Sequence, residues 1–345
     1  MSRLWALALF VACLPVNPPL SAAEPLWRWE CASQAESPDL DAPGEAASWL
    51  TATGRAWLGV HAAFMLDGGM AEVDGEARPK VEAALQAGGP LHWEVAAIAQ
   101  AAGNPRGVVV GLQASKEQPS FAIEQHGDRW VLRCGAVLDL GAVKAGQRQV
   151  LHAWRAADGS LGGAVDDQPT KAVAKGPMPV GNPRLVVGGE LNAEARWHGA
   201  IEAMQLDQQV PDATALAARQ QALAALWEKR PDPAPVDVTL RLVAGHETVP
   251  DDYPRILVGC IYDVVQVHRG TLAAKRIRLT QWGRLGDEIK EIIGVPAGHE
   301  RRMAIVAADP KLVPVLERGV NTIDADATDE QRAGVAAQGY YALLP

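Results

Sequence analysis

Apolar and polar residues alternate in short runs along much of the first 206 residues. A period of two is typical of strands that bury one face of a sheet. The clearest runs are residues 26–30, 91–95, 120–133, 150–154 and 182–206. Turn residues such as Gly127-Asp128 and Asp158-Gly159 interrupt the alternation, as the reversal between two strands requires. The pattern therefore predicts a mainly β region arranged as a β-sandwich.

The pattern changes at residue 212. Residues 212–230 are rich in Ala and Leu, Asp212 can cap the start of a helix, and Lys229-Arg230 complement its negative end. Residues 231–235 read PDPAP, which cannot continue a helix and predicts a short stiff linker. We therefore expect a first domain over residues 24–227, a linker over 228–235 and a second domain over 236–345.

The second domain contains four β-branched runs, at residues 236–243, 256–267, 276–282 and 303–308. His268-Arg269-Gly270 predicts a turn between the second and the third run. The segments 262–270 and 275–279 together resemble a phrase found in exported bacterial β-domains of barrel type. We therefore predict a smaller β-rich domain close to the OB-like barrels.

The first domain carries a series of weak motifs in a consistent order. They are Trp27 and Trp29, then Leu40-Asp41 and Trp49, the strands at 91–95, 120–133 and 150–154, the hairpin at 163–167, and finally Trp197-His198-Gly199. Over about 200 residues this series resembles the laminin G-like, concanavalin A-like jelly-roll family. Cys31 stands where that family has glycine, and Asp167 replaces a turn glycine with a residue that also tolerates the left-handed conformation.

The resemblance implies a jelly-roll sandwich and roles for four residues near its end. Trp197 is expected to pack beneath a polar turn, and Gly199 to let the next strand come close. Glu190 and Arg196 are expected to form an ion pair that braces the turn. Calcium at the sandwich rim is a further implication, with Asp39, Asp41, Asp166 and Asp167 as weak candidates. No spacing among them predicts the six to eight oxygens that calcium needs.

The first 23 residues predict a secretory signal peptide. Arg3 supplies the positive charge, residues 4–12 the apolar segment, and Ser21-Ala22-Ala23 the small residues before cleavage. An alternative interpretation takes Cys13 as the cysteine of a lipoprotein. Either interpretation predicts export to the periplasm or beyond it. There, Cys31, Cys134 and Cys260 allow one disulfide with one thiol left over, or three buried small residues.

The charge balance narrows the class of partner. The formal net charge is −9, whereas nucleic-acid binding requires a concentrated basic surface. No stretch after the predicted signal reaches the roughly 18 apolar residues that span a bilayer. The chain has 11 tryptophans against 3 phenylalanines, and indole faces suit both sugar stacking and core packing. Because Trp29, Trp49, Trp93, Trp130 and Trp154 lie in predicted strands, we expect them in the core.

Catalysis has one candidate motif. Glu72, Asp74 and Glu76 match an ExDxE pattern that one family of jelly-roll glycosidases uses, with the two glutamates as nucleophile and acid. On a strand all three carboxylates would share one face. Gly75 and the helical pattern of residues 77–86 favour a solvated acidic turn instead. Zinc-ligand spacing, a nucleophile elbow and a phosphate-binding loop do not occur in the sequence.

The sequence therefore predicts an exported, non-catalytic protein that binds a glycan or a protein at the cell envelope, with no nucleic-acid partner and no membrane span. Two alternatives stay open. The chain could be a glycoside hydrolase that uses Glu72 and Glu76, or a structural subunit of an envelope or polysaccharide assembly.

Overall fold

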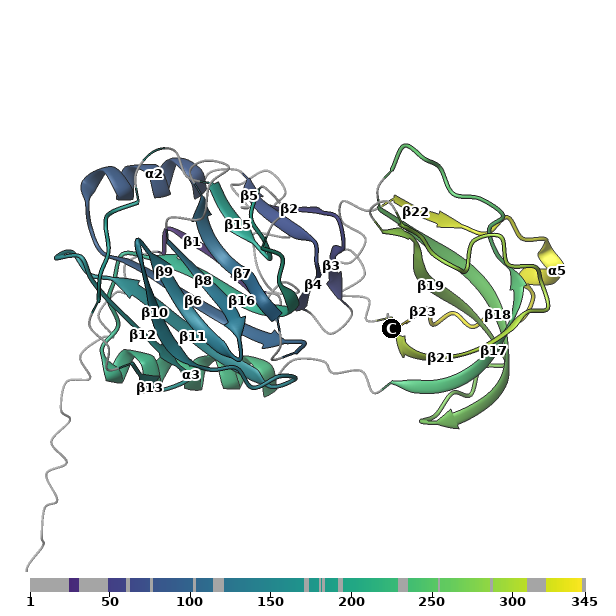
Figure 1. Cartoon of the computed structure of the whole chain (residues 1–345). Coiled ribbons are helices and arrows are strands. Elements are labelled where there is room, and N and C mark those ends of the chain that lie inside the picture. Colours follow the sequence, from purple (N-terminus) through teal and green to yellow (C-terminus); the bar gives the residue numbers. More distant parts are fainter. Residues whose placement is uncertain are drawn as a thin grey trace, which may run out of the picture.

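The computed structural model describes residues 25–30, 49–59, 63–74, 77–101, 104–113, 121–170, 174–179, 181, 184–191, 195–228, 235–253, 255–285, 288–308 and 321–342. These residues form two β domains, a sandwich followed by a smaller barrel (Figure 1). The mainly β, two-domain architecture expected from the alternation is confirmed. Among the described helices, none is long and apolar enough to cross a bilayer.

The sandwich consists of two antiparallel sheets, here called sheet A and sheet B. Sheet A runs, from edge to edge, through β13 (Gln168–Pro169), β12 (Ser160–Val165), β11 (Arg148–Arg155), β6 (Leu91–Ala99), β16 (His198–Asp207), β4 (Ala63–Asp67) and β3 (Ala56–Gly59), with β1 (Trp27–Glu30) beside β16 and β14 (Ala174–Lys175) beside β12. Sheet B runs through β10 (Ala136–Ala142), β9 (Arg129–Cys134), β8 (Phe121–Gly127), β7 (Asn104–Gln113), β15 (Arg184–Val187), β5 (Met70–Asp74) and β2 (Trp49–Thr53).

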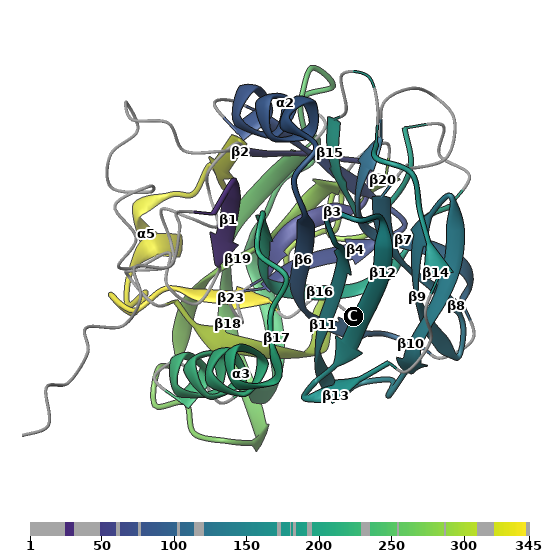
Figure 2. The same ribbon diagram turned by 90° about the vertical axis from the view of Figure 1, so that its left-hand side faces the viewer.

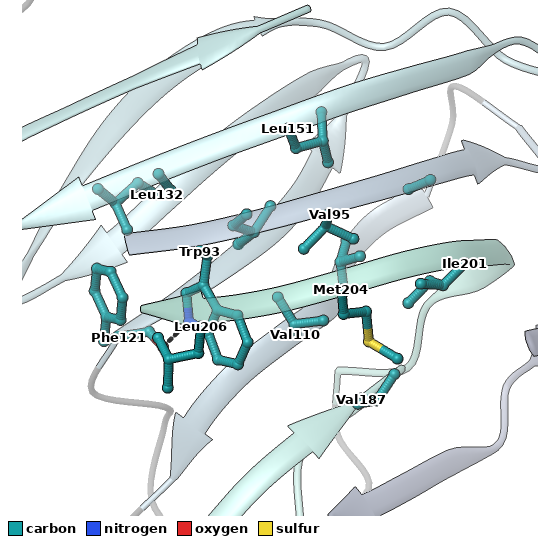
Figure 3. Close-up of a cluster of buried hydrophobic side chains, with 14 of the residues drawn as sticks. Trp93, Val95, Val110, Phe121, Leu132, Leu151, Val187, Ile201, Met204 and Leu206 are labelled. Atoms are coloured by element: carbon teal, nitrogen blue, oxygen red, sulfur yellow. Dashed lines mark hydrogen bonds between the residues drawn. The ribbon is translucent and has the colours of Figure 1, made fainter. Parts of the chain in front are cut away.

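The core lies between the two sheets, where alternate residues of each strand meet. Trp93, Val95 and Leu151 come from sheet A, while Phe121 and Leu132 come from sheet B, and all of them are buried (Figure 3). This apolar layer is what the period-two alternation predicted.

Two buried glutamines of the core are satisfied by hydrogen bonds. Gln125 accepts from the indole of Trp197 at 2.8 Å and donates to the carbonyls of Ala101 and Gly127. Gln149 likewise accepts from Trp130 at 3.0 Å. A buried amide without such partners would be strongly destabilising, so these contacts explain how the core tolerates glutamines.

Two longer helices accompany the sandwich, α2 (Ala77–Ala87) and α3 (Ala213–Glu228). Asp212 caps α3 by accepting from the backbone N–H of Ala215 at 2.8 Å, as its position in the sequence predicts. Leu223 of α3 packs against Ala96, Val150 and Ala203, which lie on the outer face of sheet A. The helix therefore covers part of that face (Figure 2).

The second domain is a closed barrel of five strands. Its order is β17 (Val236–Ala244), β18 (Arg255–Arg269), β19 (Arg276–Leu285), β23 (Tyr340–Ala342) and β21 (Glu300–Ala307), which pairs again with β17. The edge strands β20 (Glu288–Ile289) and β22 (Asn321–Asp324) and the short helix α5 (Asp329–Arg332) complete it. The predicted β-rich barrel is confirmed.

Candidate functional site

A cluster of polar side chains lies on the outer face of sheet A, where α3 covers it. In the register of β6 with its neighbours, His92 stands opposite Asp207 and Trp154, and Glu94 stands opposite Gln205 and His152. Trp93 and Val95, between and after the two polar residues of β6, point into the core. The alternation of β6 therefore directs His92 and Glu94 to the outer face.

Three of these side chains form a chain of contacts. Oδ2 of Asp207 lies 3.3 Å from Nδ1 of His92, and Nε2 of His92 lies 3.2 Å from Nδ1 of His152. The two imidazole rings are nearly parallel, with an interplanar angle of 14° and centroids 5.4 Å apart. Nε2 of His152 is buried and has no hydrogen-bond partner among the described residues. Each histidine of the pair is thus fixed in orientation by the next polar group.

The helix contributes a charge to the cluster. Nε of Arg219, from α3, donates to Oε1 of Glu94 at 2.6 Å. Gln205 donates to Oδ2 of Asp207 at 3.0 Å, and the backbone N–H of Gln209 donates to Oδ1 at 2.8 Å. The ion pair therefore links α3 to the centre of sheet A, and the carboxylate of Asp207 is held by three separate donors.

Burial shifts the pKa values in this cluster. It lowers the pKa of His152 to about 3, aided by the charges of His92 and Arg219. It also raises the pKa of Glu94, although Arg219 opposes the shift. Burial alone would raise the pKa of Asp207, but the hydrogen bond and charge of His92 lower it below its usual value. His152 is therefore uncharged at neutral pH, and a base this weak is poorly suited to general-base catalysis.

Trp154 borders the cluster and is only partly buried. Its indole lies against Gly162, where a Cβ atom would be 2.5 Å from the ring, and it meets the His92 ring edge-on at 6.4 Å. By contrast, the tryptophans with the least exposure are Trp27, Trp93, Trp130 and Trp197. An indole that keeps contact with solvent beside fixed polar groups is typical of a binding surface.

The sequence gives only part of the signal for this site. It shows His92-Trp93-Glu94 and His152-Ala153-Trp154 as strands, and alternation assigns the outer members of each triplet to one face. It does not show that β6 lies between β11 and β16. Asp207 and Arg219 enter the site only through that pairing and the docking of α3.

The residues predicted around the polar turn lie in different places: Trp197 in the core, Gly199 in β16 of sheet A, and Glu190 beside Arg106. Trp197 is buried, and a Cβ atom on Gly199 would lie 2.4 Å from its ring and 2.5 Å from a backbone oxygen. Glu190 is buried and accepts from Arg106. Burial lowers the pKa of Arg196, and the negative charge of nearby Glu190 opposes the shift.

Glu190 belongs to a larger ionic cluster on the outer face of sheet B. The buried carboxylate of Glu124 accepts from Arg106 at 3.1 Å, from Arg133 at 2.7 Å and from His126 at 2.6 Å. Burial alone would raise the pKa of Glu124, yet these three hydrogen bonds lower it. Glu124 therefore stays ionised at neutral pH, which suits an anchor for arginines.

The remaining candidate residues do not meet in one place. Glu72 of β5 forms an ion pair at 3.2 Å with Arg184 of the neighbouring strand β15. Glu76 lies outside the described residues. Asp39 and Asp41 also lie outside them. Asp166 accepts from the backbone of Val150 at 3.0 Å, and Asp167 accepts from Gln168. Among the described residues, no three or more His, Cys, Asp or Glu side chains are arranged so that they could hold a metal ion.

The two described cysteines are separate. Cys134 is buried in the sandwich and Cys260 in the barrel, and both thiols are free. Burial raises the pKa of each to about 11. Cys13 and Cys31 lie outside the described residues, as does the predicted signal peptide.

Comparisons with known proteins give only remote similarity. No protein-family model and no curated protein matches the chain. Trypanosoma rangeli sialidase matches 51% of this chain with 13% identity and a TM-score of 0.41, and the match spans only 30% of the sialidase. The binding domain of botulinum neurotoxin DC, solved with rat synaptotagmin II, matches 77% of this chain and 70% of its own at 8% identity and a TM-score of 0.42. Similarity at this level supports no inference about activity or ligand.

Proposed function

We propose that this chain is an exported, non-catalytic binding protein whose sandwich, of the laminin G-like and concanavalin A-like kind, recognises a carbohydrate at the cell envelope. The observation that carries the proposal is the partly exposed indole of Trp154 at the border of a polar cluster in which Asp207 and Arg219 are partly exposed as well. A sugar ring presents an apolar face and a rim of hydroxyls. An aromatic plane with neighbouring donors and acceptors complements both.

The electrostatics support binding rather than hydrolysis. Glycoside hydrolysis needs one carboxylic acid that is protonated near neutral pH and a second carboxylate about 5 to 10 Å away. Of the motif that suggested such a pair, Glu72 is engaged by Arg184. In the cluster beneath α3, burial raises the pKa of Glu94, but Arg219 opposes that shift and occupies the carboxylate, and His92 occupies that of Asp207.

A glycan array followed by calorimetry tests the proposal. The mature protein is screened against neutral and acidic glycans, and the dissociation constant of the best ligand is measured for wild type and for Trp154→Ala. We expect this change to weaken binding about tenfold or more, equivalent to about 1.4 kcal/mol. Tyr253→Ala, which removes an exposed aromatic ring from the barrel, is the control and should bind as wild type does. Glycan binding that survives Trp154→Ala unchanged would place the ligand elsewhere.

Export has its own test. The protein expressed with its first 23 residues should appear in the periplasmic or extracellular fraction, with a mature N-terminus at Glu24. A protein that keeps Met1 and stays in the cytoplasm would contradict this part of the proposal. A mature form beginning with a lipid-modified Cys13 would support the lipoprotein alternative.

A further inference from the structure

An apolar contact joins the two domains. Trp57, on edge strand β3 of the sandwich, packs against Leu257 of β18 and against Trp282 and Leu285 of β19. The three barrel residues are buried, yet they belong to a cluster separate from the barrel's own core, which contains Ile256 and Val258. They therefore lie on the outside of the barrel. Figure 1 shows β3 at the end of the sandwich that faces the barrel.

Two polar contacts surround this apolar cluster. The guanidinium of Arg255, at the start of β18, donates to the backbone carbonyl of Ala56 in β3. Arg55 donates to Glu288 of β20 at 3.0 Å. Burial lowers the pKa of Arg255 to about 10, which agrees with a guanidinium withdrawn from water at the contact. A buried charge is tolerated only where it is hydrogen-bonded, so this carbonyl of the sandwich is a specific partner for the barrel.

The contact also covers an edge that would otherwise be open. Among the described strands, β3 is the last of sheet A and pairs within the sheet only with β4. An uncovered edge strand promotes pairing with other chains, and an uncovered patch of tryptophan and leucine promotes association. The barrel therefore covers the open edge of β3, and the sandwich covers the apolar patch of the barrel.

We infer that the outer face of β18 and β19 is a docking surface for the β3 edge of the same chain, and that this contact holds the two domains together without help from the linker. A short linker gives its two ends an effective concentration of the order of millimolar, so even a weak contact would form in the intact chain. A central tryptophan packed among buried apolar side chains is typical of the residues that dominate binding energy. The contact should therefore persist at micromolar concentration after the linker is cut.

The test uses the whole chain with a site-specific protease sequence in place of residues 229–234. After complete cleavage, the two fragments should co-elute from a size-exclusion column at about micromolar concentration, as expected for contacts with buried aromatic anchors. With Trp57→Ala the cleaved fragments should elute separately. Tyr253→Ala, an exposed aromatic of the barrel, is the matched control and should co-elute.

A second variant keeps the test valid if Trp57→Ala does not fold. Glu288→Arg replaces an exposed side chain on β20, so it should fold normally while opposing Arg55. Its fragments should separate at low salt and re-associate when salt screens the repulsion. Circular dichroism verifies that each cleaved variant keeps its strands. Wild-type fragments that separate, or folded Trp57→Ala fragments that stay together, would overturn the inference.

Discussion

Arginine–carboxylate pairs occur in both domains, and two pairs of the sandwich have a buried carboxylate whereas two pairs of the barrel are exposed. In the sandwich, Glu124 and Glu202 are buried and each is bound by arginine. In the barrel, Glu300 pairs with Arg241 and Asp324 with Arg278, yet both carboxylates remain exposed. The pairs have the same chemistry but differ in their exposure to solvent. The comparison teaches that an ion pair's contribution to stability follows from what covers it.

The difference in cover has a structural origin. Sheets A and B are each covered in part on the outside, sheet A by α3 and sheet B by Leu191 and Ala195, which pack on Val108 and Val186. A polar side chain under such cover destabilises the fold unless it has a hydrogen-bond or ion-pair partner. The two barrel pairs are exposed to water, so they contribute only about 0 to 1 kcal/mol each.

The largest expected effect comes from Trp197, which is buried in the sandwich and donates to Gln125. Trp197→Ala should lower the free energy of unfolding of the sandwich by about 3 to 5 kcal/mol, the range typical of large aromatic truncations. Denaturant titration followed by circular dichroism measures it. Trp197→Phe keeps a ring but loses the indole donor, so its free energy of unfolding should lie between those of wild type and Trp197→Ala. A Trp197→Ala variant as stable as wild type would show that the turn does not depend on this ring.

The same contrast predicts a smaller loss at Glu124. Glu124→Gln removes the charge that Arg106 and Arg133 share, and breaking a buried pair costs about 3 to 5 kcal/mol. We expect a loss near the lower end, about 3 kcal/mol, because both arginines keep some contact with water. Denaturant titration at neutral pH checks it. A loss below that of the barrel variant described below would contradict the comparison.

The sequence predicts some residues of the Glu124 cluster but not others. Alternation assigns Glu124 and His126 to one face and Phe121 and Ile123 to the other, as in the structure. The partner Glu190 lies far away in the sequence, and only the fold of the turn onto sheet B brings it to Arg106. Period two tells which side a residue faces, but not which strand lies next to it.

The domain architecture was more accessible than the sites. β-branched runs and turn residues were enough to predict both β domains, because they depend on local preferences. The cluster of His92, His152 and Asp207 depends on β16 lying beside β6, which no local preference encodes. The contact of Trp57 with the barrel is of the same non-local kind.

A moderate effect is expected when the pH falls, again in the sandwich. Burial lowers the pKa of His152 to about 3, below the value of about 6.5 that an unfolded histidine has. The neutral ring therefore contributes stability that is fully present above pH 6.5 and is lost as the pH falls toward 3. At pH 5 the loss should be about 2 kcal/mol.

His152→Gln isolates this effect. The variant has no imidazole to titrate, so its free energy of unfolding should fall by about 2 kcal/mol less than that of wild type between pH 7 and pH 5. Glu94 and Asp207 titrate in both proteins, and their contributions largely cancel in the difference. Identical pH dependence in the two proteins would show that His152 is not shielded from water.

The smallest effect belongs to the barrel. Glu300→Gln removes an exposed partner of Arg241, and we expect a change in the free energy of unfolding below about 1 kcal/mol, reduced further by salt. Denaturant titration of the barrel's transition at low and high salt measures it. A loss as large as that of Glu124→Gln would remove the distinction between the buried pair of the sandwich and the exposed pair of the barrel.

The position of β16 in sheet A bears on how the chain folds. β16 is the last strand of the sandwich in sequence, yet it lies between β6 and β4 and also pairs with β1. Sheet A therefore cannot grow strand by strand from its N-terminal side. Until residues 198–207 insert, β4 and β6 each keep an open hydrogen-bonding edge. Contacts this distant in sequence slow folding to about milliseconds or seconds. Chaperones that shield strand edges would therefore act on this chain before its last sandwich strand pairs.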